Sequence, residues 1–149
     1  MHPTRPPQSK KRQRELASKM ASDFEAAPLH NKVHEEIGED EQFALLLNAA
    51  DWTRHAQERR EDELGSDAER VDGLGEAAEA ISHIARTRAR EVVAEACATV
   101  ISDADQWVEK DHIEARAAES AVDEAREWLR HNTNVSDRLG LLGEVTSDE

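Results

Sequence analysis

The chain has 149 residues, of which 35% are charged and only 3% are aromatic, and its formal net charge at pH 7 is −14. That length suits one domain, but the scarcity of large apolar residues predicts a lean core, of the kind that self-association often completes. No run of eighteen apolar residues exists and no apolar segment follows the basic start, so we expect neither a membrane span nor a secretion signal.

The first twenty residues are basic, in contrast to the rest of the chain. Six basic residues stand against Glu15, a net charge of +5, which leaves −19 for the remainder. We expect residues 1–14 to form a flexible arm. This arm binds nucleic acid, binds the acidic remainder of the same chain, or only aids solubility. The candidate anion-binding residues are Lys10, Lys11, Arg12 and Arg14.

Two short helices are predicted next. Ser9 can cap the first, which presents Leu16, Met20 and Phe24 on one face and ends before Pro28. The second helix ends near Gly38. Its apolar residues, four apart, are Leu29, Val33 and Ile37.

Two histidines share one face of the second helix. His30 and His34 have the i, i+4 spacing that suits two ligands of one metal ion, although Asn31 stands where an H-E-x-x-H motif has its catalytic Glu. The alternative is that both histidines are exposed or partly packed and bind no metal.

An acidic segment on the same helix resembles part of a known enzyme family. Glu35, Glu36 and Glu39 fit the E-E-x-x-E metal-binding segment of the all-helical MazG-like nucleotide pyrophosphohydrolases, a match of about six residues. The resemblance implies a divalent metal on these carboxylates and nucleotide hydrolysis. The family's second segment, E-x-x-D, departs here, because Ser66 stands three residues after Glu63 and Asp67 is one place too far.

A third helix is predicted from Asp40 to Leu64. It carries the densest hydrophobic patch of the chain, in which we expect Trp52 to be a packing anchor. The patch consists of Phe43, Leu46, Leu47, Ala50, Trp52 and Ala56. A connection from Gly65 to Gly75 should follow, with Ser66 and Glu69 forming the capping box of a brief helical turn.

The stretch from Glu76 to Arg130 contains no Pro or Gly and has apolar residues at three- and four-residue steps. It predicts either one long helix, about 80 Å in length, or a hairpin. The S-x-x-D signal at Ser102 slightly favours a hairpin turn there. The single Cys97 lies in the apolar stripe, so we expect a small core residue and a reducing, cytoplasmic setting.

The carboxyl-terminal part changes character at the turn-forming run His131–Asn134. We expect Ser136 to cap a short helix that carries Leu139, Leu141 and Leu142, and residues 143–149 to fray. Apolar residues here either cover the end of the bundle or dock a protein partner. The candidate partner-binding residues are Trp107, Trp128, Leu139 and Leu142.

The sequence therefore predicts an all-α helical bundle, a single domain at residues 15–142, dominated by the long helix or hairpin at about residues 76–130. It has no G-x-S-x-G elbow and no phosphate-binding loop, and we predict no enzyme and no cofactor. The acidic surface is either solvated, salt-adapted, or an imitation of nucleic acid that docks a basic protein.

The function we expect is that of a non-catalytic, self-associating adaptor, regulator or assembly factor, which by analogy suits phage or plasmid proteins. The alternatives are the metal-dependent nucleotide hydrolase and a nucleic-acid-associated protein that binds through its basic arm.

Overall fold

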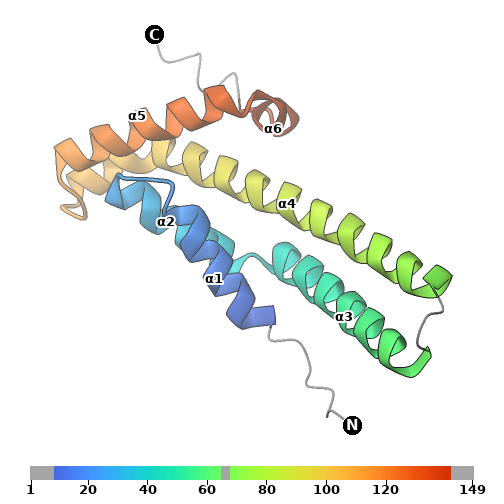
Figure 1. Cartoon of the computed structure of the whole chain (residues 1–149). Helices are drawn as coiled ribbons and strands as arrows, with labels where there is room; N and C mark the ends of the chain where they lie inside the picture. Colours follow the sequence, from blue (N-terminus) through green and yellow to red (C-terminus); the bar gives the residue numbers. More distant parts are fainter. Residues whose placement is uncertain (1–8, 65–67, 142–149) are drawn as a thin grey trace.

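The computed structural model describes residues 9–64 and 68–141. Within these residues the chain forms six helices and no strand, so the predicted all-α class is confirmed (Figure 1). The helices are α1 (Ser9–Ala21), α2 (Ala27–Glu39), α3 (Glu41–Leu64), α4 (Ala68–Glu109), α5 (Ala115–His131) and α6 (Thr133–Arg138). The predictions for residues 1–8 and 142–149 lie outside the described residues.

Helix α4, with 42 residues, runs through the whole fold. Helix α3 lies along its first half, whereas α2 and α5 pack along its second half, and α1 packs on α2 and α3 (Figure 1). Nowhere in the described part of the chain is a helix both long and apolar enough to cross a membrane.

The core is built largely from Ala and Val, as the lean composition predicts. Leu29, Val33 and Ile37 of α2 are 0% exposed, which confirms the predicted apolar face of this helix. Cys97 of α4 is also fully buried, so its expected place in the core is confirmed. Small side chains let helices approach closely, and each contact therefore buries little area.

The stretch at residues 76–130 is a hairpin, but the predicted turn near Ser102 is wrong. Helix α4 continues through this residue to Glu109. The hydroxyl of Ser102 donates to the carbonyl of Thr99, at 3.3 Å, and to the carboxylate of Asp103, at 2.8 Å. A serine side chain that bonds within its own helix caps no new one, and without Gly or Pro the helix continues.

The turn lies at Asp111, where α4 ends in a Schellman motif. The amide of His112 donates to the carbonyl of Trp107, at 2.9 Å, and the amide of Asp111 donates to that of Val108, at 3.1 Å. Asp111 takes the left-handed backbone conformation that this motif requires, with φ of 56°. Asp tolerates that conformation better than most residues, and the chain can therefore reverse here without a glycine.

The glycine-rich connection predicted from Gly65 to Gly75 is also wrong over most of its length. Helix α4 begins at Ala68 and includes both Gly73 and Gly75. A glycine inside a helix costs about 1 kcal/mol relative to alanine but does not break the helix. A Cβ atom at Gly75 would lie 3.1 Å from the end of the flexible Gln57 side chain in α3, which would have to shift to make room. Ser66 lies outside the described residues.

Two predictions at the ends of the domain need correction. Helix α1 ends before Pro28, as expected, but already at Ala21, so Phe24 is buried in the connection that follows and is not on the helix. Helix α6 starts at Thr133, so Ser136 is an internal residue and not the predicted cap. Its buried hydroxyl donates to the carbonyl of Leu129, at 3.1 Å, which ties α6 to the end of α5.

Candidate functional site

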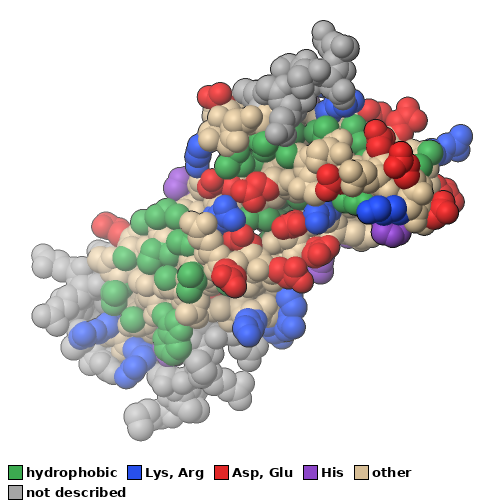
Figure 2. Space-filling model, turned by 180° about the vertical axis from the view of Figure 1, so that it is seen from behind, with side chains coloured by type: hydrophobic (Ala, Val, Ile, Leu, Met, Phe, Trp, Pro, Cys, Tyr) green, Lys and Arg blue, Asp and Glu red, His purple; other side chains and the backbone are tan. Residues whose placement is uncertain are grey.

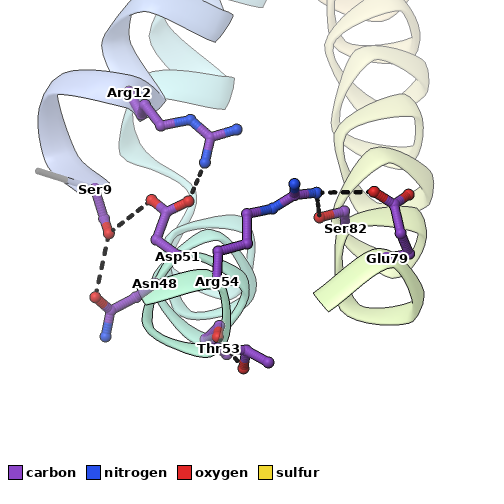
Figure 3. Close-up of polar contacts among 9 residues, drawn as sticks. Ser9, Arg12, Asn48, Asp51, Thr53, Arg54, Glu79 and Ser82 are labelled. Carbon is purple, nitrogen blue, oxygen red and sulfur yellow. Dashed lines mark hydrogen bonds and ion pairs between the residues drawn. The ribbon is translucent and has the colours of Figure 1, made fainter. Parts of the chain in front are cut away.

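The predicted anion-binding residues of the basic arm belong to helix α1. Lys10, Lys11 and Arg14 are exposed on this helix. Arg12 instead pairs with the buried carboxylate of Asp51 in α3 (Figure 3). Arg12 is therefore engaged in an ion pair within the chain, whereas the other three cations face solvent.

The predicted metal ligands on α2 lie on an open surface. Glu35 and Glu39 are exposed, while Glu36 pairs with Lys32 at 3.0 Å, and this hydrogen bond raises the pKa of Lys32. The ring of His34 lies 3.0 Å from the hydroxyl of Ser18. His30 is half-buried.

Among the residues whose side chains the structure describes, no three His, Cys, Asp or Glu are placed to hold a metal ion. The side chain of Glu63 and all of Ser66 and Asp67, where the second hydrolase segment was sought, lie outside the described residues.

Three of the four predicted partner-binding residues lie against the core. Trp107, Trp128 and Leu139 are half-buried and pack against the buried core cluster. Leu142 lies outside the described residues. Their binding to a protein partner stays a prediction.

Helix α3 carries large exposed apolar side chains, which are described below. The position of this helix on the bundle is set at its start by Asp40. This carboxylate caps α3 by accepting the amide of Phe43, at 2.7 Å, and also accepts the guanidinium of Arg88 from α4. The carbonyl of Asp40 accepts the side-chain amide of buried Gln13 from α1, at 3.0 Å, and the same amide reaches the carbonyl of Ile37 in α2, at 2.9 Å. Four helices are thus joined at one residue.

Two more polar residues hold α3 farther along, through contacts that are drawn in Figure 3. Asp51, only 8% exposed, accepts the hydroxyl of Ser9 at 3.1 Å as well as the guanidinium of Arg12. Arg54 reaches across to α4, where it donates to Glu79 at 3.1 Å and to the hydroxyl of Ser82 at 3.2 Å. These contacts orient one side of α3 toward α1 and α4.

The side of α3 that faces its neighbours is apolar, and so is the opposite side. Phe43, Leu47 and Ala50 are buried at i, i+4, i+7 spacing. The same spacing, displaced by two residues and hence by about 200° around the helix, recurs on the outer side. This outer stripe consists of Leu45, Ala49, Trp52 and Ala56.

The outer stripe is open to solvent. Leu45 is 70% exposed and Trp52 is 47% exposed, and Ile84 on the adjacent α4 is 52% exposed. On the face shown in Figure 2, hydrophobic side chains gather over the half of the molecule formed by α3 and the start of α4. The expectation that Trp52 is a packing anchor is therefore wrong: beyond its edge contact with the ring of His55, at 5.6 Å between centroids, much of this indole faces water.

The sequence contains a signal for this surface that the prediction of a single hydrophobic patch overlooked. Apolar residues on α3 fall into two sets with the same helical spacing, two residues out of phase. A helix with one apolar stripe needs one partner, whereas a helix with two opposite stripes needs two. Within the described chain only one of the two stripes on α3 is covered.

Comparison of the chain with protein-family models, with curated proteins and with solved structures finds no match to any of them.

Proposed function

We propose that this chain is a non-catalytic protein-binding adaptor or assembly factor, which docks another polypeptide on the outer stripe of α3. The observation that supports this proposal is the exposure of Leu45 and Trp52 on one face of a helix whose other face is already packed. Contiguous exposed apolar surface of this kind marks protein interaction sites in soluble proteins.

The chemistry of the stripe suits an apolar helix as its partner. Burial of a large apolar side chain contributes about 1.5–3 kcal/mol, and Trp is among the residues that most often dominate binding energy. The contacts of Asp40, Asp51 and Arg54 hold α3 on the bundle, so little conformational entropy is lost when a partner covers its outer face. An amphipathic helix can pack its own apolar face along such a stripe, as in other helix pairs.

Site-specific photo-crosslinking in the native host tests this function. A photoreactive amino acid in place of Ala49, in the middle of the stripe, should form covalent adducts with protein, detected as bands of higher mass. The matched control is the same amino acid in place of Ala115, which is exposed in the first turn of α5. If the two positions give the same adducts, or if neither gives any, the stripe is not a docking surface.

A second candidate function, nucleic-acid binding, is favoured by the exposure of Lys10, Lys11 and Arg14 on one helix of an otherwise acidic protein. Binding through phosphate contacts weakens steeply with salt. Gel shifts at two salt concentrations should then show binding that falls with salt and is lost when these three residues are replaced by Gln. Replacement of Lys19, an exposed cation near the end of α1, is the control.

A further inference from the structure

We infer that the polypeptide docked on the outer stripe of α3 is a second copy of this chain, with the two α3 helices antiparallel across a two-fold axis. This inference rests on the proposed function, since it names the occupant of the surface proposed there. It follows from the order of side chains along the stripe and from the charges that flank it.

The stripe is complementary to itself when it is reversed. In an antiparallel pair centred between Ala50 and Asp51, Leu45 of one copy lies opposite Ala56 of the other, and Ala49 lies opposite Trp52. Each large side chain therefore meets a small one, which lets two helices interdigitate without a gap or a clash. Because the axis is two-fold, each contact occurs twice.

The flanking charges favour the same arrangement. Glu41 and Arg59 are both exposed and are eighteen residues apart, about five helical turns, so they lie on the same flank of the stripe at its opposite ends. In the antiparallel pair Glu41 of one copy lies beside Arg59 of the other. In a parallel pair the two-fold axis runs along the helices and puts the two copies of each charge at the same level on opposite flanks, so Glu41 of one copy does not meet Arg59 of the other.

The area available predicts a weak dimer. A single pair of helices buries less than the roughly 1,200 Å² at which standard interfaces begin, so we expect a dissociation constant in the micromolar range. Sedimentation analysis of the full chain between about 5 and about 500 μM covers that range. Leu45→Glu, which puts a carboxylate into the stripe at a position that is already 70% exposed, should leave the chain monomeric throughout.

A charge-reversal experiment tests the antiparallel geometry. Glu41→Arg and Arg59→Glu should each weaken self-association about tenfold, because each reverses two symmetric contacts. An equimolar mixture of the two variants should restore association to the wild-type strength, since every reversed charge then meets its opposite. Glu58→Lys, which reverses an exposed charge on the inner side of α3, should change nothing. Thermal unfolding of each variant checks that it is folded.

Two outcomes overturn the inference and leave the proposed function in place. One is a wild-type chain that stays monomeric at every concentration while position 49 still crosslinks to protein in the host. The other is a mixture of Glu41→Arg and Arg59→Glu that stays as weak as either variant alone. The inference is supported if the adducts from position 49 contain only this chain and the mixture of the two variants recovers the self-association of the wild type. Absence of protein adducts at position 49 overturns the proposed function itself.

Discussion

The guanidinium of Arg88 in α4 binds the carboxylate of Asp40 at the start of α3 through two hydrogen bonds, of 2.6 and 3.0 Å. Their side chains are only 19% and 14% exposed, so both charges are largely removed from water and depend on one another. The same carboxylate caps α3, and hence this pair decides where α3 begins and how it lies on α4.

We predict strong energetic coupling between these two residues. Asp40→Asn keeps a capping side chain but removes the charge, and Arg88→Met keeps the aliphatic stem. Each should lower the free energy of unfolding by about 1–3 kcal/mol, because each removes the main partner of a largely buried charge. Arg88 would keep only its longer contact with Glu95, at 3.8 Å. Urea denaturation of both variants and of the double variant should give a coupling energy of about 0.5–3 kcal/mol. Arg86→Met, at an exposed position on α4, is the control; additive effects would contradict the coupling.

The same pair makes stability depend on pH in acid. Burial alone would raise the pKa of the Asp40 carboxyl, but the hydrogen bond from Arg88 and the amide of Phe43 outweigh it and hold the pKa below the usual 3.8. A carboxyl whose folded pKa is lowered adds stability above its unfolded pKa and loses it as the pH falls through the folded pKa. The difference in unfolding free energy between wild type and Asp40→Asn should therefore be constant above about pH 5 and shrink below about pH 4. A difference in unfolding free energy that grows as the pH falls would contradict this prediction.

Asp111 and Gly140, both in the left-handed conformation, should respond to substitution in opposite ways. Asp111, with φ of 56°, ends α4, and Gly140, with φ of 72°, ends α6 in a second Schellman motif. Asp111→Gly removes a strained side chain and should raise the stability by about 0.5–1 kcal/mol. Gly140→Ala should lower it by about 1 kcal/mol for backbone reasons alone, because a Cβ there meets nothing within 4 Å. Thermal unfolding measures the stability of both variants. Changes in stability of the same sign would contradict this prediction.

A carboxylate on α5 should control the order of the connection between α1 and α2. Glu124 accepts the backbone amides of Glu25 and Ala26, each at 3.0 Å, just before α2 begins. Glu124→Gln removes the charge and replaces one acceptor oxygen with a donor, so it should cost about 1–2 kcal/mol. Hydrogen exchange at these two amides should become faster than in Glu127→Gln, an exposed control on the same helix.

Cys97 should be inert in the native protein. Burial, with a further contribution from the charge of Glu124, raises the pKa of its thiol to about 12. The thiolate is the reactive form, so a thiol reagent at pH 8 should modify Cys97 only when the fold opens, and rapidly in denaturant. Modification of the native chain at the rate of a free thiol would contradict the buried position.

Local patterns determined several features of this protein. The spacing of Leu29, Val33 and Ile37 placed the buried face of α2, because a 3.6-residue repeat brings these side chains to one side whatever packs on them. The predicted run His131–Asn134 marked the end of α5 at His131, although only Asn132 separates α5 from α6. Such features depend on residues that are close together along the chain, and they can therefore be predicted from the sequence.

Other features depended on which elements come together in space. The hairpin turns at Asp111 and not at Ser102, because a serine can satisfy its hydroxyl inside a helix as well as at its start. Tertiary packing also determined which face of α3 is left as the candidate docking surface. The sequence of α3 specifies two apolar stripes, and only the packing of α1 and α4 determines that Phe43 is covered while Trp52 is left in water. Helical periodicity determines which residues share a face, whereas burial of that face requires a partner from elsewhere in the chain or from another chain.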